Sequence, residues 1–341
     1  MIEHDLAARC AWLACSSAVS LAGAARTFHS PCSPGAAAGA DDSLLRVRFS
    51  IWPTTAQSFD DVRDAAAHAA ATGWDGVWLA DHFMPPTPSG DGPMLECFST
   101  LASLATCVPR VRLGSLVASN TYRHPAVLAK QVTAIDHASG GRVVLGLGAG
   151  WQENEHVAYG IEFFDVAGRL ARLAEACEVV RHLLDDDRTS FSGRFYTLSD
   201  APMQPKPLQA RLPLLVGGGG EKVTLRITAR WADEWNTWGT PDVIAHKSKV
   251  LDRHCEEIGR DPSEIARCAQ VVVDLDGAGK PFHRPMPLVA GGVAELQDLL
   301  GRYADAGLSE FVLPDWNLGT GPERRDTMDR FISEVAAPFR S

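Results

Sequence analysis

The stretch Arg110–Trp151, RVRLGSLVASNTYRHPAVLAKQVTAIDHASGGRVVLGLGAGW, decides the expected fold. Its two outer runs, Val111–Val117 and Arg142–Leu147, contain almost no polar residue, which is typical of strands buried on both faces. Between them, Pro125–His137 has apolar residues at helical spacing, and the glycine pair that follows can end a helix. The stretch therefore predicts one right-handed, parallel βαβ unit.

The same alternation of strand and helix continues on both sides of this unit, from Arg46 to Ala337. Eight β/α pairs can be placed there, so we expect a (β/α)₈ barrel of the TIM type, with a doubly wound open sheet as the alternative. An irregular stretch, Thr189–Pro207, predicts a hairpin insertion between the fourth and fifth strands. In such folds the functional residues lie at the carboxyl ends of the strands.

Composition and charge limit the kinds of molecule that we expect the protein to bind. The chain is 45% hydrophobic with a formal net charge of −10 at pH 7, and it has no block of Lys and Arg. We therefore expect neither nucleic acid nor membrane as a partner. No later stretch has the roughly 18 apolar residues of a membrane helix.

The first 45 residues are unusually rich in Ala, Ser, Gly and Cys. We expect a disordered extension there and a single domain over residues 46–341. An export signal is the alternative, but Glu3 and Asp5 stand where such a signal is basic. The expected location is cytoplasmic.

Metal chemistry is not expected. The eight cysteines show neither a CxxC pair nor zinc spacing. Glu153, Glu155 and His156 follow Trp151 in an expected loop, but no further ligand converges on them, so no metal site is predicted. We expect buried free thiols at five cysteines in apolar or helical context. These are Cys97, Cys107, Cys177, Cys255 and Cys268.

Two motifs at strand ends are candidates for the site. Asp81-His82 follows the predicted strand Gly76–Ala80, and a histidine there can exchange a proton near neutral pH, although a plain surface loop is the alternative. The run Gly217–Gly220 lies between the predicted strand Leu212–Val216 and the predicted helix Glu221–Arg230. Free amides at that helix start favour a phosphate or another cofactor oxygen, with a tight turn as the alternative.

Tryptophans also follow strand ends, where either core packing or a pocket wall would suit them. We expect Trp52, Trp151 and Trp238 to line a substrate pocket, and leave Trp235 open. Trp151 also stands where a dinucleotide fingerprint would have its third glycine, so the glycines before it do not predict such a site.

Taken in order, several short motifs resemble the luciferase-like monooxygenase superfamily, and most closely its coenzyme F420-dependent oxidoreductases. The motifs are Trp78–Phe83, Arg112–Gly114, Tyr122–Pro125, Ser139–Arg142, Leu145–Trp151, Phe191–Arg194, Pro205–Pro207, Gly217-Gly218 and Ala232-Asp233.

The resemblance implies a flavin or deazaflavin at the carboxyl-end mouth of the barrel. His82 would then donate a proton or orient the ring, Asp81 would hold the polar ring edge, and a non-proline cis peptide would join Leu116 and Val117. Asn120, Ala149 and Gly150 would line the ring and side chain of the cofactor. Gly217, Gly218, Gly219 and Gly220 would receive its ribityl-phosphate tail.

The function implied is hydride transfer between F420 and a small organic substrate. An FMNH₂-dependent monooxygenase is the alternative, and a non-catalytic flavin-binding protein is the second alternative. Some sugar-phosphate-oxidising relatives have a glutamate where this chain has Trp151, and no set of basic residues suits a phosphate, so we do not expect that activity. The expected pocket walls are aromatic and apolar, which favours a weakly polar organic substrate. The family also implies a homodimer and a possible flavin or F420 reductase partner.

Overall fold

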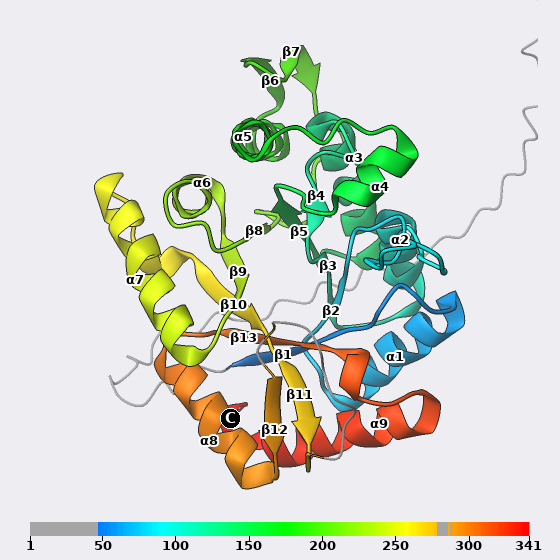
Figure 1. Ribbon diagram of the computed structural model, residues 1–341. Helices are drawn as coiled ribbons and strands as arrows, with labels where there is room; N and C mark the ends of the chain where they lie inside the picture. The colour runs from blue at the N-terminus through cyan, green and yellow to red at the C-terminus, as the bar shows by residue number, and fades with distance from the viewer. Residues whose placement is uncertain (1–46, 278–285, 287, 341) are drawn as a thin grey trace, which may run out of the picture. The chain divides into compact units, whose positions relative to one another are not determined.

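The computed structural model describes residues 47–277, 286 and 288–340 (Figure 1). Eight parallel strands pair side by side, and the β1–β13 and β3–β5 pairings close the ring. The predicted (β/α)₈ barrel is confirmed, and the open-sheet alternative is wrong. The barrel strands are β1 (Arg48–Trp52), β2 (Gly76–Leu79), β3 (Arg112–Ser115), β5 (Val143–Gly148), β8 (Leu214–Gly217), β9 (Glu234–Trp238), β10 (Ala266–Gln270) and β13 (Glu310–Pro314).

Helices follow the strands and surround the barrel (Figure 1). They are α1 (Phe59–Thr72), α2 (Cys97–Cys107), α3 (Pro125–Ser139), α4 (Glu153–Tyr159), α5 (Val166–Asp185), α6 (Thr224–Trp231), α7 (Pro241–Glu257), α8 (Val293–Asp305) and α9 (Gly321–Arg330). Local sequence sets their ends: the Ser58 side chain accepts from the amide of Asp61 at the start of α1, and Gly73 ends that helix at a φ of 93°.

Three predicted elements are corrected. The residues after Trp151 form helix α4 and not a loop. The predicted helix Glu221–Arg230 starts later, at Thr224, because a turn follows the glycine run. The predicted strand Ala266–Leu275 divides into β10 and β11 (Val272–Leu275), and β11 pairs with β12 (Leu288–Gly291) in a separate sheet.

Two other predictions are confirmed. The non-proline cis peptide joins Leu116 and Val117, and the short strand β4 (Ala118–Ser119) continues beyond it. The insertion between the fourth and fifth barrel strands is the antiparallel pair β6 (Arg188–Ser192) and β7 (Thr197–Pro202). The expected disordered extension, residues 1–45, lies outside the described residues. No helix in the described part of the chain is long and apolar enough to cross a membrane.

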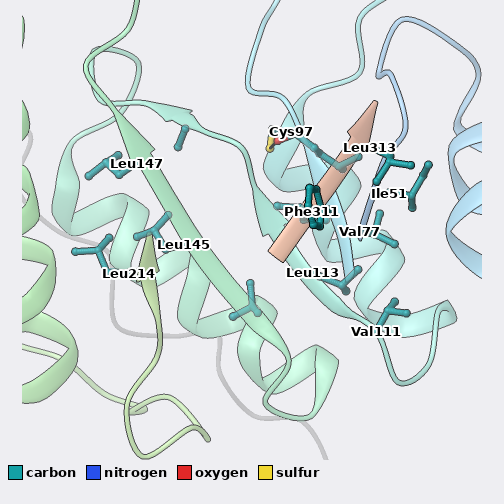
Figure 2. Packing of buried hydrophobic residues seen from close by; sticks show 14 of the residues in the cluster. Ile51, Val77, Cys97, Val111, Leu113, Leu145, Leu147, Leu214, Phe311 and Leu313 are labelled. Carbon is teal, nitrogen blue, oxygen red and sulfur yellow. Dashed lines mark hydrogen bonds between the residues drawn. The ribbon is translucent and has the colours of Figure 1, made fainter. Parts of the chain in front are cut away.

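Side chains alternate along the barrel strands between the surrounding helices and the interior. On β2, Val77 and Leu79 belong to the cluster packed against the helices, whereas Trp78 belongs to the interior cluster. Figure 2 shows part of the outer cluster, including Val77 and Leu113. Trp78 fills the space above Gly114, where an added Cβ would lie 2.3 Å from its ring. Trp78 and its neighbours in the interior cluster thus fill the barrel below its mouth.

Most cysteine predictions agree with the structure. The five cysteines in question are free thiols, and Cys97, Cys177, Cys255 and Cys268 are buried. Cys107 is exposed, contrary to the prediction, because it is the last residue of α2 and its side chain faces away from the core.

Candidate active site

A cavity of about 940 Å³ lies at the carboxyl ends of the barrel strands. It is large enough for a cofactor ring together with a small substrate. Most predicted site residues line it: Trp52, Asp81, His82, Leu116, Val117, Ala149, Gly150, Trp151, Gly217, Gly218, Gly219 and Trp238. Asn120 and Gly220 lie outside this lining, and Trp235 packs in the core beneath α6 and α7.

His82 is held in one orientation by a carboxylate. Its Nδ1 lies 2.8 Å from Oε1 of Glu155, and its ring meets that of Trp151 edge to face at 5.3 Å between centroids. No described residue hydrogen-bonds to its Nε2, and His82 lines the cavity. The pair therefore leaves one imidazole nitrogen for a ligand.

Glu155 is a buried anion at the centre of a polar cluster. Its side chain is 0% exposed, and it also accepts from the amide of Phe83 at 2.9 Å and from the hydroxyl of Tyr122. Burial raises its pKa, but the bonds from His82, Tyr122 and Phe83 outweigh that and leave the pKa of Glu155 below its ordinary value. The same burial, together with the Glu155 charge, raises the pKa of Tyr122. Glu155 is thus ionised at neutral pH, and Tyr122 keeps its proton.

A Glu155→Gln substitution is expected to lower turnover roughly 10- to 100-fold, the rate equivalent of about 1.5–3 kcal/mol for one hydrogen bond to a charged group. The amide keeps the shape but turns an NH₂ donor toward either the Phe83 amide or the His82–Tyr122 pair, and it removes the charge that stabilises a protonated His82. Steady-state kinetics should show the loss in kcat, with cofactor affinity and melting temperature near wild type. Glu153→Gln, an exposed neighbour on α4, is the control, and equal losses in both variants would contradict the role of Glu155.

Asp81 forms a second buried ion pair. Arg123 donates to both carboxylate oxygens, at 2.7 and 3.0 Å, and the amide of Ser119 donates to one of them at 3.0 Å. Arg123 also bonds to Glu96, whose side chain caps α2. Burial raises the pKa of Asp81, and the Arg123 charge opposes that shift. Asp81 therefore joins the ends of β2 and β4 to α2, and its contact with a cofactor ring stays a prediction.

One wall of the cavity is built of residues without bulky side chains. A Cβ on Gly148 would lie 2.6 Å from Val117, and one on Gly217 would lie 2.7 Å from it. Gly150 has a φ of 83°, a backbone conformation that residues other than glycine rarely adopt. Gly148 and Gly217 thus make room for Val117 and keep this wall free of bulky side chains, so the residues present fit the ring of a flavin or deazaflavin.

The glycine run continues from this wall. Lys247 donates to the carbonyl of Gly219 at 2.7 Å and pairs with Glu221 at 3.2 Å, so a positive charge lies beside the run. Val223, before the first turn of α6, provides no side-chain cap for the helix amides. Both features suit an anion at this loop.

Comparison with known proteins decides the family. The family model described as luciferase-like monooxygenase matches residues 42–276. The chain belongs to the luciferase-like monooxygenase family. The resemblance seen in the sequence motifs is thereby confirmed, and with it the expected class of oxidoreductase.

Within this family, the chain is 30% identical over 271 residues to the F420-dependent glucose-6-phosphate dehydrogenase of Kineococcus radiotolerans, which covers 76% of the chain and 79% of the relative. It is 29% identical to the F420-dependent hydroxymycolic acid dehydrogenase of Mycobacterium tuberculosis, over 75% and 72% of the two proteins. A solved F420-dependent secondary alcohol dehydrogenase, in complex with an F420-acetone adduct, superposes with a TM-score of 0.76 at 19% identity. That match covers 87% of this chain and 100% of the dehydrogenase, and shows the shared fold.

The site of this luciferase-like protein contains residues that sequence reasoning missed. Arg123 lies within the motif Tyr122–Pro125, which marks it as a candidate. Its partner Asp81 is 42 positions away, so the sequence does not indicate their pairing. The sequence indicates Glu155 only as a candidate metal ligand. Among the described residues, no group of three or more His, Cys, Asp or Glu is placed to hold a metal ion.

Proposed function

We propose that the chain is a coenzyme F420-dependent oxidoreductase that transfers a hydride to or from a small organic substrate. The observation that carries this proposal is the His82–Glu155 pair, which lies on the same cavity as the flat wall around Val117. The F420-dependent relatives support the choice of coenzyme. When bound, the deazaflavin supplies a two-electron centre that exchanges a hydride and not single electrons.

The chain's own residues orient the reactants and handle the proton. Nε2 of His82 takes the hydroxyl proton of an alcohol, or returns it to a carbonyl oxygen in the reverse direction. Glu155 stabilises the imidazolium that forms and holds the ring in place. Trp151 covers the imidazole from one side. The coenzyme ring would lie on the wall of Val117, Gly148 and Gly217, and the tail would run to Gly219 and Lys247.

Fluorescence titration of the purified protein, separately with oxidised F420 and with FMN, tests the choice of coenzyme. We expect micromolar binding of F420 and much weaker binding of FMN. The opposite preference would favour the FMN-dependent monooxygenase, and binding of neither would remove both enzyme proposals. Binding of F420 without turnover of any substrate would leave the non-catalytic flavin-binding protein.

A Gly217→Ala substitution is expected to weaken F420 binding at least about tenfold, because the added methyl group enters the space of Val117 and moves the wall. Gly301→Ala is the matched control, since a Cβ there has 3.9 Å to its nearest neighbour, Phe339. Calorimetric titration of both variants measures the difference. Equal affinities would place the ring elsewhere.

A homodimer and a separate flavin or F420 reductase are family expectations and remain proposals. The cytoplasmic location, which was expected from the sequence, also remains a proposal. Light scattering of the purified protein would test the homodimer.

A further inference from the structure

The mouth of the barrel has two chemically different halves. The ends of β2, β3, β5 and β8 carry His82 and the glycine-lined wall. The ends of β9, β10, β13 and β1, which follow next around the ring, carry tryptophans and carboxamides. Because the first half suits the coenzyme, the second half is left for the substrate.

We propose that this second half selects a neutral oxygenated molecule with an aromatic or alicyclic body, an alcohol or the matching carbonyl compound, and rejects sugar phosphates. Trp52, Trp238 and Trp316 hold the body, and the carboxamides of Gln270 and Asn317 hold its polar group. This inference rests on the proposed function for its redox step, but the binding surface stands on its own geometry.

The three tryptophans form a continuous aromatic wall. The ring centroids of Trp52 and Trp316 lie 5.3 Å apart, and those of Trp238 and Trp316 lie 6.1 Å apart with an angle of 24° between planes. The ring centroids of Trp52 and Trp238 also lie 6.1 Å apart. All three line the cavity. Such a wall stabilises apolar rings by dispersion and removal of water, and gives nothing to a strongly hydrated anion.

The wall is fixed before any ligand arrives. Trp52 and Trp238 are the last residues of β1 and β9, and Trp316 lies in the 3₁₀ turn Asp315–Asn317 that follows β13. Buried Asp315 anchors this turn, since it accepts from the amide of Thr54 at 3.0 Å and from Arg324 at 2.8 Å. The turn is thereby held against the end of β1, so binding orders few side chains.

Two buried polar groups beside the wall have no hydrogen-bond partner in the described part of the chain. Gln270, which is 5% exposed, is the register partner of Trp238, and its Oε1 has no hydrogen bond to a described residue. Nδ2 of Asn317, next to Trp316, also has none. Both residues line the cavity. A buried amide without a partner is unfavourable. A ligand hydroxyl or carbonyl oxygen can accept from Nδ2 of Asn317, but only a hydroxyl can donate to Oε1 of Gln270.

The charge of the described lining residues disfavours a phosphorylated substrate. No Lys or Arg lines the cavity among the described residues, and the one acidic residue in the lining, Asp81, is paired with Arg123. Against these described residues, a phosphate group would lose its water shell without gaining a matching cation. The described residues of the substrate half therefore suit a neutral substrate better than a sugar phosphate, although one relative at 30% identity is named a glucose-6-phosphate dehydrogenase.

The test uses three neutral probes, 1-phenylethanol, acetophenone and cyclohexanol, with glucose 6-phosphate as the charged competitor. Quenching of tryptophan fluorescence measures binding with and without F420, and the change in F420 absorbance measures turnover. For 1-phenylethanol, the hydride passes to the oxidised coenzyme, the hydroxyl proton passes to His82, and acetophenone forms. We expect at least one neutral probe to bind and glucose 6-phosphate not to bind.

Trp238→Ala should raise the KM or Kd of the neutral probe at least about tenfold, with the Kd of F420 changed less than about twofold. Gln270→Ala should do the same to a smaller extent. Trp231→Ala, next to His182 and outside the cavity lining, is the control. The proposal fails if no neutral probe binds, if glucose 6-phosphate is the better substrate, or if Trp238→Ala behaves like the control. If F420 does not bind but a neutral probe still binds through Trp238, the proposed function fails and the pocket inference stands.

Discussion

His82→Ala is expected to lower kcat by roughly 10²- to 10⁴-fold, the usual contribution of a positioned acid or base. Alanine removes the nitrogen that exchanges the substrate proton and leaves the Glu155 carboxylate without its imidazole partner. The flat wall around Val117 is untouched, so the Kd of F420 should change less than about threefold. Single-turnover absorbance measurements give the rate, and fluorescence titration gives the affinity.

The separation of rate from affinity is the informative part of this experiment. His137→Ala is the control, because His137 is exposed on α3 and its ring bonds to the carbonyl of Lys206 at 2.7 Å, away from the cavity. If His82→Ala lost coenzyme affinity and rate together, His82 would be a binding residue only. If the rate were unchanged, another group would handle the proton.

The barrel could be predicted because its strands carry a strong local signal. Strands buried on both faces read as short apolar runs, and Val111–Val117 and Arg142–Leu147 do so without ambiguity. The same signal misled at Ala266–Leu275, where the apolar run continues although the chain leaves the barrel after β10. Periodicity shows that a segment is buried but not which sheet buries it. Helix α4 was missed for the opposite reason, since its seven residues, ENEHVAY, have too few apolar positions for a periodic pattern.

The site could be predicted only where position along a strand decides function. Asp81, His82 and the glycines follow strand ends, and the cavity is there. Pairings between distant residues leave no such signal: His82 and Glu155 are 73 positions apart. Trp316 did have a usable signal, because it follows the strand Glu310–Pro314 just as Trp151 follows Arg142–Leu147. The unpaired amides of Gln270 and Asn317 needed the structure, since lack of a partner is a property of the packed interior.

The largest effect on stability is expected at the opposite end of the barrel from the cavity. Glu310, fully buried at the start of β13, accepts from Arg48 at 3.0 Å and from Arg112 at 2.7 Å, and its other oxygen accepts from Ser50 and Trp78. In Glu310→Ala, Arg48 and Arg112 keep only Glu234 as a carboxylate partner among the described residues, and removing one member of a buried ion pair costs about 3–5 kcal/mol. The midpoint of urea unfolding measures the loss.

Glu264→Ala is the control for Glu310→Ala, because Glu264 is exposed and its pair with Arg260 contributes at most about 1 kcal/mol. Burial raises the pKa of Glu310, but Arg112 and Arg48 outweigh it and hold the pKa below its ordinary value. The stabilisation is therefore complete above the ordinary carboxyl pKa of about 4.3 and is lost as the pH falls through the lowered one. The difference in the free energy of unfolding between wild type and Glu310→Ala should therefore become smaller over that acidic range. A difference that stays constant with pH, or equals that of Glu264→Ala, would show that the Glu310 charge does not stabilise the barrel base.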